Sequence, residues 1–362
     1  MVRYNPIAKF SKFLPIPYLE RFTLDNKIDL QNKPENVNIF LTPIIYGPFN
    51  FQYKKIGEKH FKIVKKKIDQ NSIKFDLILA KFFWSSGYVG SKLKEKYNIP
   101  LIVEGLGYDV YDLPFRDFVW NKKIRNILNS SNKIITVSNY CQKYINKLDV
   151  KTSLKIFPNG FNTGLFFPQN TKTSRKKLNL PYNKKIILNV GNLIDIKGQI
   201  YLINAIKIIK RYRNDILCII IGSGKLKNKL KRIIKNLKLE KEIIIIDHRP
   251  HSEIALWMNA CDVFAFPSLR ESFGVVQIEA LACGKPIVAT KNGGSQEIIK
   301  SIKLGFLVDP KNASELSSAI IKVLDGSFDR NYISSYAKKN YSWQNIISRM
   351  VNLMEDIILK DS

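Results

Sequence analysis

"KIILNVGNLIDIKGQIYLINAIKIIKRYRNDILCIIIG", residues 185–222, is the stretch that decides the fold. Both of its ends are short runs of Ile, Leu and Val closed by glycine, and such continuous apolar runs are typical of buried parallel strands. Between them Leu202, Ile206 and Ile209 recur with the spacing of one helix face. The stretch therefore predicts a strand, a helix and a second strand, which is one repeat of a doubly wound sheet.

The same alternation continues along the chain. Short Ile- and Val-rich runs alternate with amphipathic segments such as residues 54–68 and 87–97. We therefore expect an α/β fold with two Rossmann-like doubly wound domains that face each other across a cleft. The predicted strands are residues 37–43, 75–82, 100–107, 132–138, 153–160, 185–191, 215–222, 242–247, 262–268 and 286–290.

A polar stretch over residues 168–185 predicts a linker between the two halves. We assign residues 1–168 to the N-terminal domain and residues 169–338 to the C-terminal domain. The last segment, residues 339–362, is amphipathic, and we expect it to form a helix that packs at the domain junction.

Composition limits the class of protein. The 362 residues are 45% hydrophobic, which is enough to bury a sizeable core. The formal net charge is +29, and 27 basic and 13 acidic residues fall in residues 1–170 against 32 and 17 in the rest. The basic residues are spread evenly and form no basic tail or module. The net charge is therefore the only argument for a nucleic-acid-binding protein. No window reaches about 18 apolar residues, so we expect neither export nor a membrane span.

Cysteine and histidine usage disfavours metal and disulfide chemistry. The four cysteines form no CxxC pair, which fits a reduced cytoplasmic protein; they are Cys141, Cys218, Cys261 and Cys283. We interpret each of the three histidines as structural or solvent-facing, and we expect no metal site; they are His60, His248 and His251.

Two carboxylates flank a predicted helix start in "ESFGVVQIEA", residues 271–280. Ser272 is a good N-cap, so we expect the helix to begin near Phe273 and its free amides to favour a phosphate. Glu271 lies just ahead of this helix and Glu279 lies along it, and each carboxylate is suited to accept hydrogen bonds from the hydroxyls of a sugar. The alternative interpretation is two solvated glutamates beside an ordinary helix.

Six segments carry a family resemblance that covers most of residues 75–350. They are KIITVSNYCQKY (133–144), FPNGFNTGLFFP (157–168), ILNVGNLIDIKG (187–198), IIGSGKLKNKL (220–230), SEIALWMNACDVFAFPS (252–268) and ESFGVVQIEALACGKPIVATKNGGSQEII (271–299). In this order they resemble the retaining glycosyltransferases with the GT-B fold, glycosyltransferase family 4 (glycosyl transferases group 1). The resemblance implies that the N-terminal domain is on the acceptor side and that the C-terminal domain binds a nucleotide-sugar donor.

The resemblance also implies roles for single residues. Glu271 would contact the donor sugar, Glu279 would hold the ribose hydroxyls, and Lys197 would neutralise the leaving diphosphate without a metal. The other donor-binding positions that it implies are Gly191, Asn192, Gly222, Phe273, Gly274 and Val275. The alternatives are an exposed lysine at position 197 and a purely structural turn at Gly222.

Three features depart from the family pattern. Asn192 stands where the family commonly has an arginine, so this position brings no charge to the phosphates. Leu106 stands where a histidine is often found, and the nearby Asp109 is either a structural cap or an acceptor contact. Since "MVRYNPIAKFSKF" contains no Gly-rich loop, the first domain is expected to lack the family's initial strand, loop and helix.

The resemblance therefore implies a glycosyltransferase of the kind used in polysaccharide biosynthesis. It would transfer a hexosyl group from a UDP- or GDP-sugar co-substrate to a glycan or lipid-linked acceptor, with retention and with no metal or other cofactor. We expect a cytoplasmic enzyme, in peripheral contact with the cytoplasmic membrane face, that binds no nucleic acid. The alternative is a non-catalytic relic of the fold that binds a sugar nucleotide or a partner protein.

Overall fold

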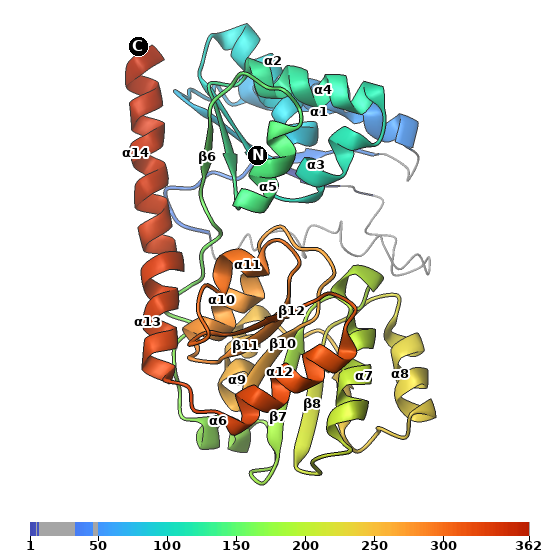
Figure 1. Cartoon of the computed structure of the whole chain (residues 1–362). Coiled ribbons are helices and arrows are strands. Elements are labelled where there is room, and N and C mark those ends of the chain that lie inside the picture. The colour runs from blue at the N-terminus through green and yellow to red at the C-terminus, as the bar shows by residue number, and fades with distance from the viewer. Residues whose placement is uncertain (5, 7–32, 46–49, 362) are drawn as a thin grey trace. The chain divides into compact units, whose positions relative to one another are not determined.

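The computed structural model describes residues 1–4, 6, 33–45 and 50–361 (Figure 1). The chain divides into two compact units, Met1–Phe157 together with Val351–Ser362, and Pro158–Met350. Each unit contains parallel sheets with helices between successive strands, which confirms the predicted α/β class. The domain boundaries predicted from the sequence stay a prediction.

The second unit is built on one six-stranded parallel sheet in the order β12-β11-β10-β7-β8-β9. The chain runs outward from β7 to β9 and then returns to place β10 on the other side of β7. The strands are β7 (Lys185–Val190), β8 (Ile216–Ile221), β9 (Ile243–Ile246), β10 (Val263–Phe266), β11 (Ile287–Thr290) and β12 (Gly305–Val308). The helices are α6 (Thr171–Lys177), α7 (Gln199–Ile209), α8 (Lys227–Asn236), α9 (His251–Ala260), α10 (Val275–Ala282), α11 (Ser295–Ile298), α12 (Ala313–Asp325) and α13 (Arg330–Tyr341).

Apolar side chains on one face of this sheet pack against its helices. The three residues predicted to share one face of α7, namely Leu202, Ile206 and Ile209, are fully buried in a hydrophobic core cluster together with strand residues. Leu316 and Ile320 of α12, which packs against α7, belong to the same cluster. Each such side chain contributes about 1.5–3 kcal/mol on burial, so the regular apolar spacing is sufficient to fix the helices on the sheet.

The first unit has two separate parallel sheets, β1-β2 and β3-β4-β5-β6. The strands are β1 (Val2–Tyr4), β2 (Leu41–Pro43), β3 (Ile78–Lys81), β4 (Leu101–Gly105), β5 (Lys133–Thr136) and β6 (Leu154–Ile156). Its longer helices are α1 (Asn50–Gln70), α2 (Tyr88–Tyr97), α4 (Phe118–Ser130) and α5 (Asn139–Asn146), and α14 (Trp343–Asp361) closes the chain. None of the helices described in the chain combines the length and the apolar character needed to cross a bilayer.

Three local expectations need correction. A strand does exist near the start of the chain, because β1 pairs with β2 over Val2–Tyr4, although three residues are too few to give a periodic signal. The expected absence of the Gly-rich loop and the helix concerns residues 7–32, which lie outside the described residues. The predicted linker contains α6, which packs against α9, and β12 was not predicted because its four residues follow no clear helical segment.

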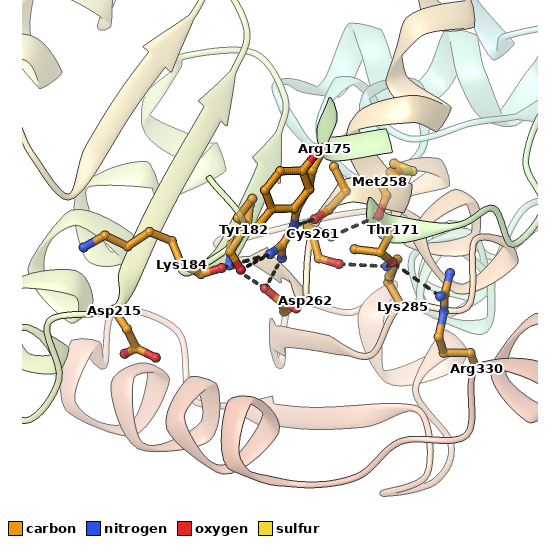
Figure 2. Close-up of polar contacts among 12 residues, drawn as sticks. Thr171, Arg175, Tyr182, Lys184, Asp215, Met258, Cys261, Asp262, Lys285 and Arg330 are labelled. Carbon is orange, nitrogen blue, oxygen red and sulfur yellow. Dashed lines mark hydrogen bonds and ion pairs between the residues drawn. The ribbon is translucent and has the colours of Figure 1, made fainter. Parts of the chain in front are cut away.

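Arg175 of α6 joins the amino ends of β7 and β10 (Figure 2). Its guanidinium pairs with Asp262 Oδ2 at 2.6 Å and donates to the carbonyl oxygens of Ala260 at 3.0 Å and Lys184 at 3.1 Å. Asp262 Oδ2 also accepts the backbone N–H of Ile186 at 2.6 Å. Because the Arg175 side chain is only 7% exposed, these contacts replace its hydration.

Lys285, which lies just before strand β11, makes buried hydrogen bonds in the same region (Figure 2). Its ammonium donates to the carbonyl oxygen of Cys261 at 2.8 Å and to Thr171 Oγ1 at 3.3 Å. Burial lowers the pKa of the Lys285 ammonium. The amino end of the sheet is thus closed by two buried cationic side chains, both of which bind carbonyl oxygens.

Replacing Arg175 with methionine should destabilise the second unit. The change removes the counter-ion of Asp262 and the side-chain donor of the carbonyl oxygens of Ala260 and Lys184, at a cost of about 3 kcal/mol. The measurement is urea denaturation combined with hydrogen exchange of the β7 and β10 amides. The matched control is Lys291→Met, which removes an exposed ion pair with Asp309 and should leave the unfolding midpoint unchanged. Equal midpoints for the two variants would contradict the role given to Arg175.

Alanine substitutions at two neighbouring glycines should have opposite effects on stability. A Cβ atom at Gly222 would lie 1.9 Å from the carbonyl oxygen of Gly191, whereas a Cβ atom at Gly191 meets nothing within 4 Å. We expect Gly222→Ala to destabilise the unit by about 2 kcal/mol because backbone must move, and Gly191→Ala to leave stability unchanged or slightly higher. Thermal unfolding of the two variants checks this, and a stable Gly222→Ala protein would refute it.

Candidate functional site

A cavity of about 370 Å³ lies at the carboxyl ends of the strands of the second unit. The order in which the chain adds strands reverses between β7 and β10, because β8 and β9 lie on one side of β7 and β10 lies on the other. In open α/β sheets, ligands bind outside the carboxyl ends of the strands at such a switch point. Segments that follow β7, β8, β9 and β10 all contribute to the wall. Residues of this wall predicted from the sequence are Gly191, Asn192, Lys197, Gly222, Glu271, Gly274, Val275 and Glu279.

The segments after β7 and β10 bring Lys197 and Glu271 together. Lys197 ends a short 3₁₀ helix, Asp195–Lys197, and Gly198 follows it in the left-handed conformation with φ of 66°. A Cβ atom at Gly198 would lie 2.1 Å from the carbonyl oxygen of Pro267, so only glycine allows this approach. The Lys197 ammonium forms an ion pair with Glu271 Oε2, and both side chains are mostly buried.

The Gly-rich turn after β11 holds Glu271 from the other side. The backbone N–H of Glu271 donates to the carbonyl oxygen of Asn292 at 3.1 Å, and that of Gly294 donates to the carbonyl oxygen of Glu271 at 2.9 Å. Gly294 lies so close to Phe273 that an added Cβ atom would be 2.6 Å from its backbone. Gly293 and Gly294 therefore fix the segment that carries the carboxylate.

Helix α10 begins later than predicted. It starts at Val275, its N-cap is Gly274 with φ of 91°, and no side chain caps it. Ser272 is therefore not the N-cap, because residues 271–273 are held by backbone contacts to the Gly-rich turn instead of coiling into the helix. The first amides of α10 still border the cavity through Gly274, Val275 and Val276.

Glu279 contacts the cavity from within α10. Its side chain is 3% exposed, and its Oε1 lies 2.7 Å from Nε2 of His251. The other oxygen, Oε2, is buried and has no hydrogen-bond partner in the part of the chain that the structure describes. The hydrogen bond with Glu279 raises the pKa of His251, although burial acts in the opposite direction.

Phe273, a predicted donor-binding residue, does not border the cavity. Phe273 is 2% exposed, and its ring packs edge-on against Tyr341 with 5.7 Å between centroids. Asp109 belongs to the first unit, where its carboxylate accepts the backbone N–H groups of Phe83, Leu106 and Gly107 at 2.9–3.2 Å. Burial raises the pKa of Asp109 to about 6 against the effect of these donors. Its contacts in the structure are those of an anchor for the loop after β4.

Sequence reasoning missed the segment after β9. His248, Arg249 and His251 all border the cavity. The two histidines are exposed, as the solvent-facing interpretation allows, but their place at the cavity was not predicted. The structural interpretation suits His60, which is buried and hydrogen-bonded to Ser85 Oγ at 2.9 Å. The available signal was positional, because Asp247 ends a predicted strand and the residues after strand ends form the ligand edge of such a sheet.

The described residues contain no group of three or more His, Cys, Asp or Glu side chains arranged to hold a metal ion. Lys197 and Arg249 are positively charged side chains that border the cavity. Together with the first turn of α10 they provide positive potential for an anionic ligand.

Comparisons with known proteins point to one family. The family model described as Glycosyltransferase Family 4 matches residues 22–165, and the model described as Glycosyl transferases group 1 matches residues 170–340. An uncharacterized glycosyltransferase of Methanocaldococcus jannaschii is 28% identical over 300 residues, which cover 82% of this chain and 79% of that protein. A D-inositol 3-phosphate glycosyltransferase of Corynebacterium jeikeium is 29% identical over 313 residues, covering 80% and 74% of the two chains.

Solved structures show the same fold. HepE of Anabaena, in complex with UDP and glucose, superposes with a TM-score of 0.73 at 23% identity, covering 87% of this chain and 86% of its own. A glycosyltransferase from Rickettsia africae gives a TM-score of 0.74 at 21% identity, covering 90% and 86% of the two chains. The two family models together span most of the chain, and the chain therefore belongs to glycosyltransferase family 4 and has the two Rossmann-like units of the GT-B fold.

Proposed function

We propose that the protein transfers a hexosyl group from a UDP- or GDP-sugar to a glycan or lipid-linked acceptor, with retention and without a metal. The observation that carries this proposal is the Lys197–Glu271 ion pair in the cavity at the start of α10. It supplies a cation and a hydroxyl acceptor within one site, which are the two groups that a sugar diphosphate requires.

The role of the Lys197 ammonium follows from the charge that develops on the leaving diphosphate. When the bond between the anomeric carbon and the diphosphate breaks, the electron pair stays on the diphosphate oxygen and negative charge grows there. The Lys197 ammonium and the free amides at the start of α10 stabilise that charge. The ion pair with Glu271 and the ring of Phe266, 5.5 Å from Nζ, hold the ammonium in place before the donor binds.

The two glutamates take the two ends of the donor. Glu271 Oε2 contacts Lys197, which leaves Oε1 to accept a hydrogen bond from a hydroxyl of the transferred sugar. Glu279 uses Oε2 for the ribose hydroxyls, since Oε1 already contacts His251. The diphosphate then lies between them, at Gly274 and Val275.

Related proteins support the choice of donor. The structure of HepE, a neighbour with the same fold, has been determined in complex with UDP and with UDP-glucose. We assign donor binding to the second unit and acceptor binding to the first, at the cytoplasmic membrane face. The net charge of +29 favours anionic lipid surfaces at such a location.

A non-catalytic relic of the fold is the alternative proposal. Its support is the uncharged Asn192, which borders the cavity where the family commonly has an arginine, and Leu106 in place of a histidine. A relic would bind the sugar nucleotide but would not release the nucleoside diphosphate, whichever acceptor is supplied.

Glu271→Gln and Lys197→Met should each lower kcat by about 100-fold or more, because each removes charge aligned with the transition state. The double variant should lose little more than either single variant, since the two side chains act as a pair. The measurement is release of UDP or GDP from hexose donors, with membrane lipids and glycans as acceptors. Lys303→Met, an exposed lysine substitution outside the cavity, is the control. Unchanged turnover in both single variants would remove these roles, and an inactive but nucleotide-binding wild type would favour the relic.

Transfer should continue undiminished after treatment with EDTA, because the charge on the leaving diphosphate is neutralised by protein groups. The anomeric configuration of the product, read from its proton NMR coupling constants, should match that of the donor. Loss of activity on chelation that Mg²⁺ or Mn²⁺ restores would contradict the metal-free proposal. An inverted product would contradict retention.

A further inference from the structure

The inference concerns His251 and rests on the proposed binding of a nucleotide-sugar. We propose that His251 is a positioning residue for Glu279: it holds one carboxylate oxygen so that the other faces the ribose of the donor. No feature of the motif around Glu279 indicates this partner, which precedes it by 28 residues and belongs to another helix.

The geometry of the pair is specific. His251 is the first residue of α9 and follows the segment after β9, whereas Glu279 lies within α10. Nε2 of the imidazole is 2.7 Å from Oε1 of the carboxylate, and both residues border the cavity. The imidazole also packs on the ring of Phe166, with 5.0 Å between centroids, and Phe166 is 1% exposed. The imidazole therefore contacts a buried ring on one side and the carboxylate on another, while 64% of the His251 side chain is exposed.

The unpartnered oxygen shows which group the pair serves. Oε2 of Glu279 is buried without a hydrogen-bond partner among the described residues. Such an atom destabilises the protein unless a ligand satisfies it. Vicinal hydroxyls are donors that suit a carboxylate, and the ribose of a nucleoside diphosphate presents two of them.

His251 restricts how the carboxylate can turn. The terminal torsion of a glutamate is broad, so an unrestrained carboxylate samples many orientations. Fixing Oε1 leaves Oε2 in a single direction and removes an entropic cost from ribose binding.

Two substitutions separate positioning from simple packing. In H251Q the amide nitrogen can reach the place of Nε2 and still donate to Glu279, whereas in H251N the shorter amide reaches only the place of Nδ1. Both replace the imidazole ring, so loss of packing on Phe166 is common to them. Only the loss of the hydrogen bond distinguishes H251N.

The experiment is calorimetric titration of the full chain with UDP and GDP and with their 2′,3′-dideoxy forms. We expect H251N to weaken binding of the preferred nucleotide by about ten-fold, and H251Q to stay within about three-fold of the wild type. The dideoxy form should bind H251N and the wild type equally, because it has no hydroxyls for Glu279 to hold. In an E279A background, H251N should cause no further loss.

The outcomes separate the two proposals. A wild type that binds neither nucleotide overturns the proposed donor site and this inference together. A wild type that binds normally while H251N weakens the hydroxylated and dideoxy forms equally overturns the positioning role alone, and so does an unchanged H251N. Thermal unfolding of each variant checks the fold. If H251N does not fold, the positioning role is tested by comparing E279A with H251Q in their affinities for the hydroxylated and the dideoxy nucleotide. Under the proposal only E279A loses the preference for the hydroxylated form.

Discussion

The site depends on backbone segments that approach one another more closely than any side chain permits. At the carboxyl edge of the second sheet, Gly222 lies against the carbonyl oxygen of Gly191 and Gly198 lies against that of Pro267. These contacts join the segments after β8, β7 and β10 into one layer. Lys197 and Glu271 are carried by that layer, so their ion pair follows from main-chain geometry before any attraction between the charges is considered.

The two ends of the same sheet have opposite properties. At the amino end, the buried cations Arg175 and Lys285 bind carbonyl oxygens and a carboxylate, which makes that end a structural closure (Figure 2). At the carboxyl end, Glu279 keeps a buried oxygen without a partner. Proteins commonly lose stability at a binding site and recover it elsewhere in the fold. In this sheet the carboxyl end carries the destabilising unpartnered oxygen, and the amino end carries the stabilising buried contacts.

Periodic signals in the sequence predicted the strands and helices well. The Ile-rich runs and the spacing of Leu202, Ile206 and Ile209 depend only on local pattern, and local pattern is what forms a strand or an amphipathic helix. Short elements such as β1 and β12 gave no such signal. The polar stretch before β7 was interpreted as a linker because lysines and threonines outnumber its apolar residues, although Arg175 within it is buried.

The site was predictable where a motif carried it. Lys197, Glu271 and Glu279 were found through their sequence context, and all three border the cavity. His251 was not, because its partner comes from another helix and only the return of the chain to β10 brings the two helices together. The prediction of Ser272 as the N-cap was wrong for a related reason. Contacts to the distant Gly-rich turn override the local preference of serine for an N-cap position.

Arg175 also determines where the second unit can be separated from the rest of the chain. A cut within the polar stretch, after residue 177, would discard the guanidinium that joins β7 to β10. Asn170 caps α6 by accepting the backbone N–H of Thr173 at 3.0 Å, and Gln169 donates its own N–H to Asn259 at 2.7 Å. A fragment intended to fold alone should therefore begin before Gln169, and a protease site placed between α6 and β7 would yield two pieces that remain associated.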